Sequence, residues 1–118
     1  LQRNLGAYAQ WALTHNSLLI LTFDEDGSTD KAQGDPYVVG THRIATVFVG
    51  EGVKPGVYDQ RIDHLNVLST VLWLHGALDT FRADFRQYHQ VREGSGSEAE
   101  LEALNLKPIT EVFRKPAP

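Results

Sequence analysis

The feature that most constrains the fold is an apolar run at residues 17–23 (SLLILTF), which ends directly in three acids, Asp24, Glu25 and Asp26. The run has the length of one strand, and its lack of polar alternation is typical of a strand covered on both faces. Three adjacent carboxylates at the end of such a strand repel one another unless water, a partner group or a metal ion compensates their charge. The sequence therefore predicts a strand inside a layered fold, with a charged end.

Strand and helix patterns continue along the chain. A second apolar strand is expected at residues 43–49 (RIATVFV), closed by Gly50. Helices are expected in four segments, which are residues 1–16, 63–76, 78–93 and 97–104. Asp63 suits the N-cap of the second helix and Gly76 suits its C-terminal end, while residues 108–113 are expected to be extended. The apolar positions of the second helix recur at helical spacing, at Leu65, Leu68, Val71 and Leu72.

Helices that alternate with covered strands imply an α/β fold, in which helices lie on both faces of a central sheet. Two strands are fewer than such a sheet usually contains. The chain has 118 residues, starts at Leu1 inside an expected helix and contains no methionine. We therefore expect that the N-terminal half of a longer protein, with the remaining strands, is missing. The length fits one soluble globular domain or a piece of one.

Composition excludes several classes of protein. The formal net charge is -4 and no long charge block occurs, which argues against nucleic-acid binding and against a broad contact with a membrane surface. No apolar run is long enough to cross a bilayer. The chain has no cysteine, so a disulfide framework and a thiolate metal site are both excluded. Oxygen ligands without cysteine favour a hard cation.

The three acids allow several interpretations. Position alone leaves a solvated loop and a ligand site equally open, because ligands of open α/β sheets bind at the carboxyl ends of the strands. A helix-loop-helix calcium site fails on spacing: with Asp24 at the first loop position, the sixth is Thr29 and not the required glycine. The third interpretation is a catalytic metal site, in which carboxylate oxygens bind a divalent cation that stabilises a phosphoryl group.

The segments around the acids carry a family resemblance. They read NLGAYAQWALTHNSLLILTFDEDG (residues 4–27), THRIATVFVG (41–50), VKPGVYDQRIDHLNVLSTV (53–71) and PITEVF (108–113). In this order they closely resemble the C-terminal part of the acid phosphatase and phospholipase C type phosphoesterases of the alkaline phosphatase superfamily. The resemblance implies a C-terminal portion of a three-layer sandwich that contributes to the hydrolysis of phosphate esters. It also suggests a secreted or periplasmic protein.

The resemblance further implies individual roles. Asp24 and Glu25 match ligands of a divalent metal ion, and His64, in IDHLNVL, matches a histidine that faces the active site. The imidazole of His64 would be a metal ligand, or a hydrogen-bond donor to the phosphate or leaving group. Without the resemblance, a histidine at a helix start is more simply a capping or surface residue. Three further residues are candidates for contacts to the ligands or the phosphate, with a solvated loop as the alternative: Asp26, His42 and Arg43.

The sequence departs from the family in two places. The nucleophile of the family is a Ser or Thr upstream of these segments, and no Ser or Thr of this chain lies in a matching motif. We therefore expect no phosphatase activity and weak metal affinity from the chain alone. At about residues 77–105 a helical insert replaces a short link, which keeps open a second hypothesis, a non-catalytic fragment or homologue that binds proteins. The substrate is left open among phosphomonoesters, phosphoinositides and phospholipids.

Overall fold

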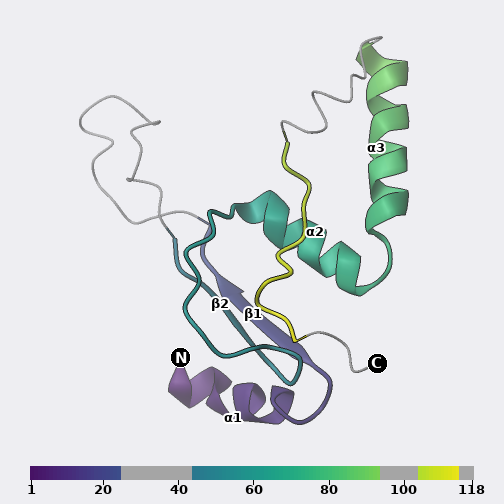
Figure 1. Ribbon diagram of the computed structural model, residues 1–118. Helices are drawn as coiled ribbons and strands as arrows, with labels where there is room; N and C mark the ends of the chain where they lie inside the picture. Colours follow the sequence, from purple (N-terminus) through teal and green to yellow (C-terminus); the bar gives the residue numbers. More distant parts are fainter. Residues whose placement is uncertain (25–43, 94–103, 115–118) are drawn as a thin grey trace, which may run out of the picture. The chain divides into compact units, whose positions relative to one another are not determined.

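The computed structural model describes residues 1–24, 44–93 and 104–114, with the backbone alone for residues 88–93 (Figure 1). Its elements are α1 (Gln2–Ala12), β1 (Leu18–Thr22), β2 (Thr46–Gly50), α2 (His64–Leu74) and α3 (Leu78–Glu93). They belong to two compact units. The first comprises Leu1–Pro55 and Phe113–Pro118, and the second comprises Gly56–Val112. The described residues thus form a small mixed α/β structure, in agreement with the α/β class expected from the sequence.

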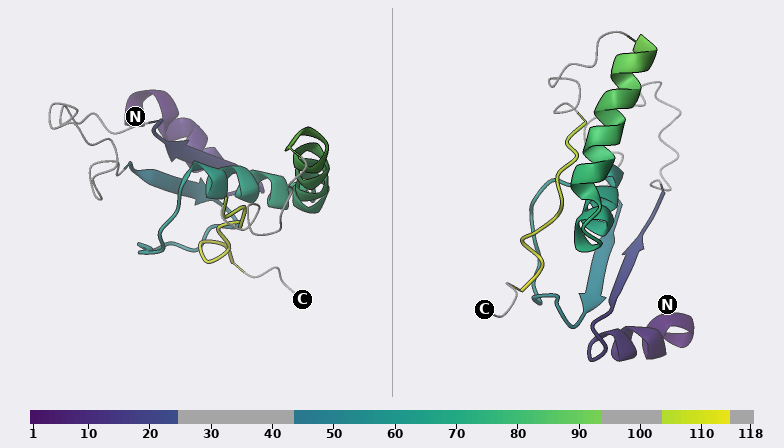
Figure 2. Two further views of the ribbon diagram at one scale, coloured as in Figure 1. Left: turned by 90° about the horizontal axis from the view of Figure 1, so that it is seen from above. Right: turned by 90° about the vertical axis from the view of Figure 1, so that its right-hand side faces the viewer.

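The sheet of the first unit is an antiparallel pair. Leu18 pairs with Gly50 and Thr22 with Thr46, and the hydroxyl groups of this threonine pair lie 3.0 Å apart. Figure 2 shows the two strands side by side and running in opposite directions. Every residue of β1 is half-buried. The strand therefore lacks the alternation of buried and exposed residues that is typical of a sheet with one face in solvent. The strand expected at residues 17–23 is confirmed, and both of its faces are partly covered.

The expected end of the second strand was wrong by one residue. Gly50 does not close β2 but is its last paired residue, opposite Leu18. A Cβ atom at this position would lie 2.3 Å from the carbonyl oxygen of Ser17, much closer than atoms can approach. The strand continues through Gly50 because glycine has no side chain to collide with the neighbouring backbone.

The helix α1 ends earlier than the expected residue 16 and is followed by a tight turn. The Ala12 carbonyl accepts a hydrogen bond from the Glu51 backbone N–H (3.0 Å), and the Glu51 carboxylate accepts one from the Asn16 N–H (2.6 Å). Asn16 has a φ of 45°, a left-handed conformation that asparagine tolerates better than most residues. The ring of His15 stacks on Trp11 with the centroids 4.5 Å apart. These contacts connect α1 to the end of β2.

The two helices of the second unit follow the sequence signals closely. Asp63 is the N-cap of α2, as predicted, and α2 ends before Gly76, whose φ of 68° reverses the chain. The helix α3 spans Leu78–Glu93, the range expected from the sequence. Figure 1 shows α2 and α3 joined by the short turn at Gly76. The helix expected at residues 97–104 lies outside the described residues, apart from Leu104 in a turn.

The buried face of α2 is polar, although apolar residues recur along the helix. Its three buried residues are polar, Asn66, Ser69 and Thr70, whereas Leu68 and Val71 remain 40% and 38% exposed. The polar side is inside because residues 104–109 pack along it and present backbone groups that need hydrogen-bond partners. The spacing of apolar residues predicted the helix correctly, and the burial of its polar side is found only in the structure.

The C-terminal segment supplies much of the core. Leu106, Ile109 and Val112 are each at most 6% exposed in the second unit. Beyond them, Phe113 forms an isolated antiparallel bridge with Val53 in the first unit and packs edge-on against Phe48. The extended conformation expected at residues 108–113 is interrupted by a turn at residues 111–112. None of the helices that the structure describes is long and apolar enough to cross a membrane.

Candidate functional site

The acid at the strand end lies where the sequence predicts. The strand β1 ends at Thr22, and Asp24 follows two residues later with an exposed side chain. Four other predicted site residues lie outside the described part of the chain: Glu25, Asp26, His42 and Arg43. They belong to the sequence that connects the Thr22–Thr46 end of the antiparallel pair. Their site roles therefore stay predictions.

His64 is the first residue of α2 and is exposed. Its neighbour Asp63 caps the helix: one carboxylate oxygen accepts from the Leu65 N–H (2.9 Å) and from the Asn66 N–H (3.1 Å). In return, the side-chain oxygen of Asn66 accepts from the Asp63 N–H (2.9 Å), which completes a capping box. Asp63, and not His64, is the cap of this helix, and His64 is an exposed residue of its first turn.

Asn66 is a residue that the sequence reasoning missed. It is 4% exposed, and its amide nitrogen donates to the carbonyl oxygens of Asn105 and Lys107, both at 3.0 Å. The signal available in the sequence was the Asp-x-x-Asn spacing of a capping box, with Asn66 in place of the usual Glu or Gln. The hydrogen bonds to Asn105 and Lys107 have no signal in the sequence, because these residues are 39 and 41 positions away.

The described residues do not by themselves complete a metal site. In the parts of the chain that the structure describes, no group of three His, Asp or Glu side chains is close enough to bind one ion. Asp24 belongs to the first unit and His64 to the second, and each unit is described by itself. The carboxylate of Asp24 has the oxygen donors that a hard divalent cation prefers, but a single carboxylate is too few ligands for such an ion.

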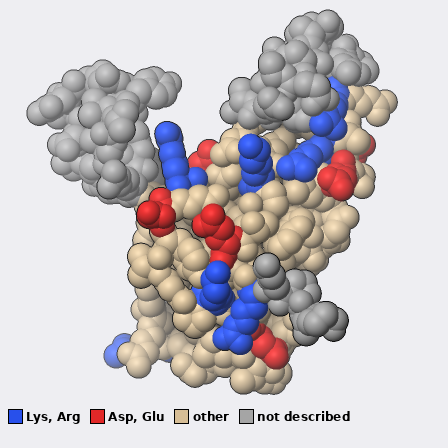
Figure 3. Space-filling view, in the orientation of Figure 1, with Lys and Arg blue, Asp and Glu red and all other residues tan. Residues whose placement is uncertain are grey.

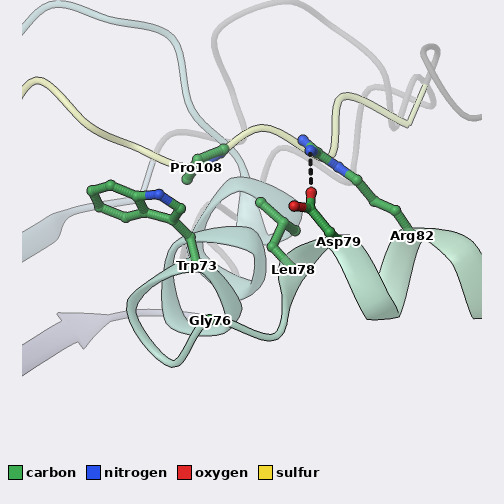
Figure 4. Close-up of a pocket in the computed structure, with 6 residues that line it drawn as sticks. All are labelled: Trp73, Gly76, Leu78, Asp79, Arg82 and Pro108. Carbon is green, nitrogen blue, oxygen red and sulfur yellow. Dashed lines mark ion pairs between the residues drawn. The ribbon is translucent and has the colours of Figure 1, made fainter.

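A shallow pocket lies between α2, α3 and the C-terminal segment (Figure 4). It has a volume of about 310 Å³, and none of the predicted site residues lines it; its lining consists of Trp73, Gly76, Leu78, Asp79, Arg82 and Pro108. The guanidinium of Arg82 lies 3.6 Å from the Asp79 carboxylate and donates to the carbonyl oxygen of Leu106. The cation is thus engaged within the unit, where it joins α3 to the C-terminal segment.

Charged side chains on the face drawn in Figure 3 are of both signs and interspersed. Basic residues lie close to acidic ones rather than gathering in one large patch on this face. A polyanion such as a nucleic acid is bound by clustered lysine and arginine. The face shown does not present such a cluster among its described residues.

Comparison with known proteins decides the family. The Phosphoesterase family matches residues 1–77, which include the acids after β1 and the start of α2. The chain belongs to the Phosphoesterase family. A curated relative is the phosphatidylinositol-3-phosphatase of Mycobacterium tuberculosis (strain ATCC 25618 / H37Rv), which is 46% identical over 76 residues. The matched part is 64% of this chain and 22% of that protein. No solved structure matches the chain.

The match confirms the resemblance seen in the sequence. All the residues predicted for the site fall within the matched residues 1–77. The match stops at Ala77, one residue before α3 begins. The likeness of residues 108–113 to the end of the family, and the description of residues 77–105 as an insert, lie beyond the match and stay predictions.

Proposed function

We propose that this phosphoesterase hydrolyses phosphate esters, and that its substrate is a phosphoinositide. The observation that carries the proposal is the family match over residues 1–77, in which Asp24 lies two residues after the end of β1. The phosphoinositide class is supported by the relative that is a phosphatidylinositol-3-phosphatase. Since the chain spans 22% of that relative, the activity is proposed for the whole protein and not for these 118 residues alone.

In this proposal the fold is a portion of an alkaline-phosphatase-like three-layer sandwich, and Asp24 and Glu25 bind a divalent metal ion. Their oxygens suit a hard cation, which when bound supplies positive charge to the phosphoryl oxygens. His64 contacts the phosphate or the leaving group from the first turn of α2, where an imidazole N–H can donate a hydrogen bond. Asp26, His42 and Arg43 provide supporting contacts.

The attacking group in the proposed reaction is a Ser or Thr outside the matched segments. We propose that it forms a phosphoryl-enzyme intermediate, which water then hydrolyses. None of the Ser and Thr residues of this chain lies in a motif that matches such a nucleophile. We therefore expect that the 118-residue chain, purified alone and loaded with metal, does not turn over a phosphate ester.

The decisive test is Asp24→Asn in the full-length protein. The substitution keeps the size of the side chain and removes the carboxylate charge, so phosphoinositide hydrolysis should fall by on the order of a hundredfold or more. Asp84→Asn, at an exposed position of α3, is the matched control and should keep full activity. Both variants should retain the circular dichroism spectrum of the parent. Equal activity of the two variants would remove Asp24 from the mechanism, whereas a parent protein that hydrolyses no phosphoinositide would favour the non-catalytic, protein-binding alternative.

A further inference from the structure

The C-terminal segment holds the helix turn that carries His64. Asn66 lies two residues after His64 and is 4% exposed. Its amide nitrogen donates to two carbonyl oxygens of the segment, those of Asn105 and Lys107, each at 3.0 Å. The position of the Asn66 side chain thus depends on residues that are 39 and 41 positions away in the sequence.

The segment forms a tight turn around this amide. Asn105 has a φ of 50°, and the Lys107 N–H donates to the Asn105 carbonyl at 2.7 Å, so that both carbonyl oxygens converge on one side chain. The same segment is anchored further along α2, where the buried hydroxyl of Thr70 accepts from the Ile109 N–H at 2.8 Å. Arg82 of α3 donates to the Leu106 carbonyl. These contacts leave the turn little freedom to shift along the helix.

The remaining polar atom of Asn66 points toward the helix start. Its side-chain oxygen accepts from the Asp63 N–H at 2.9 Å, and the Asp63 carboxylate accepts from the Asn66 N–H at 3.1 Å. His64 therefore lies between two residues that are bonded to each other in both directions. Movement of the Asn66 amide moves the backbone on both sides of His64.

Capping alone does not require the amide nitrogen. A capping box uses an acceptor oxygen at this third helical position, which Glu or Gln usually supplies from a solvated side chain. Asn66 instead uses its oxygen for the cap and both of its N–H groups for the turn at residues 105–107. Its side chain satisfies three hydrogen bonds at once and transmits the position of the turn to the first turn of α2.

We propose that Asn66 is a positioning residue, through which residues 105–107 set the orientation of His64 toward the phosphate. This inference rests on the proposed function, because it assigns His64 to the phosphate site. It adds that the site depends on sequence beyond the family match, which ends at Ala77. Orientation of a reacting group matters because a displacement of about 1 Å can cost on the order of a hundredfold in rate.

The test changes the turn at Asn105, a residue that does not belong to α2. Asn105→Val places a β-branched residue at a φ of 50°, where its side chain is strained, while Asn105→Gly accepts this φ and is the matched control. In NMR spectra of the 118-residue chain, the ring signals of His64 should shift in Asn105→Val and stay in place in Asn105→Gly. The rings of His15 and His75 serve as internal references. If Asn105→Val does not fold, Asn105→Ala imposes a milder strain and should give a smaller shift in the same direction.

A second control separates positioning from loss of stability. Ile109→Val removes one buried methylene group from the same segment without altering the turn at residues 105–107, and it should leave the His64 signals unmoved. In the full-length protein, Asn105→Val should lower kcat about tenfold or more with KM within about twofold, as expected for a misoriented reacting group. Equal shifts of the His64 ring in Asn105→Val and Ile109→Val would overturn the proposal, as would a raised KM with kcat unchanged.

The outcome distinguishes this inference from the function on which it rests. If His64→Ala in the full-length protein keeps full activity, the role of His64 in the proposed function is wrong. If His64→Ala is inactive but the NMR signals of the His64 ring do not shift in Asn105→Val, the proposed function stands and the positioning role of Asn66 is wrong.

Discussion

Gly50 illustrates how a single residue limits the sheet of this protein. It is buried as the last residue of β2, where a Cβ atom would lie 2.3 Å from the Ser17 carbonyl oxygen and 3.2 Å from the Leu18 Cα. Both atoms belong to the backbone, so neither can move aside without disturbing the strand pair. The only side chain that fits this position is a hydrogen atom.

Gly50→Ala should therefore lower the free energy of unfolding by about 1–3 kcal/mol, the usual cost of overpacking. Gly52→Ala is the control, since nothing lies within 4 Å of its added Cβ atom. Urea denaturation can be followed by the fluorescence of Trp11 in the first unit, with Trp73→Phe as the common background. Similar midpoints for the two alanine variants would contradict the close approach at Gly50.

In the second unit, Thr70 is a single residue on which the packing depends in a similar way. Its hydroxyl is completely buried, donates to the Asn66 carbonyl (2.6 Å) and accepts from the Ile109 N–H (2.8 Å). Thr70→Val keeps the shape of the side chain but leaves the Ile109 N–H without its partner, which should destabilise the unit by about 1–3 kcal/mol. Thr80→Val, exposed on α3, is the control. Denaturation followed by Trp73 fluorescence, in a Trp11→Phe background, should show a loss for Thr70→Val alone.

At the scale of elements, the start of α2 depends on its cap. The Asp63 carboxylate accepts from the backbone N–H groups of Leu65 and Asn66, and the Asn66 N–H is shared with the Asp63 carbonyl. Asp63→Ala should cost about 1 kcal/mol, whereas Asp63→Asn keeps an acceptor oxygen and should cost less. Hydrogen exchange of the Leu65 and Asn66 amides provides the measurement. Unchanged protection of both amides in Asp63→Ala would show that the cap is dispensable.

The polarity of α2 shows the limit of pattern reasoning at this scale. Leu68 and Val71 have helical spacing and yet stay exposed, whereas the structure buries Asn66, Ser69 and Thr70. A hydrophobic pattern reports which side of a helix avoids water in general. It does not report that a segment with unpaired backbone carbonyls will pack along the polar side, which depends on residues more than 30 positions later.

At the scale of the whole molecule, the C-terminal segment contributes residues to both units. Leu106, Ile109 and Val112 are three of the five buried apolar residues in the described parts of the chain. Phe113 and Arg114 continue into the first unit, where the Arg114 N–H donates to the Gly52 carbonyl at 2.8 Å. A short segment with little regular structure thus connects to α2 and, further on, to the loop after β2.

Truncation after residue 103 should therefore unfold the second unit. It removes the partners of Asn66 and Thr70 and three buried apolar side chains, those of Leu106, Ile109 and Val112. We expect the loss of cooperative thermal unfolding monitored by circular dichroism at 222 nm, roughly the wavelength of the helical amide signal. A chain that ends at Arg114 should unfold as the parent does, and cooperative unfolding of the shorter chain would refute the structural role of the segment.

The local features of this member of the Phosphoesterase family can be predicted from its sequence alone. Both strands, the range of α3, the cap at Asp63 and the acid after β1 follow from spacing and side-chain chemistry within a few residues. The family also follows from sequence, because its motifs are read in order along the chain and match residues 1–77.

Only the tertiary structure decided the antiparallel register, the pairing of Gly50, the buried side of α2 and the role of Asn66. Each of these depends on contacts between residues far apart in sequence. A local pattern states what a segment can form, whereas the partner that covers it is chosen by the free energy of packing and of hydrogen bonds across the whole chain.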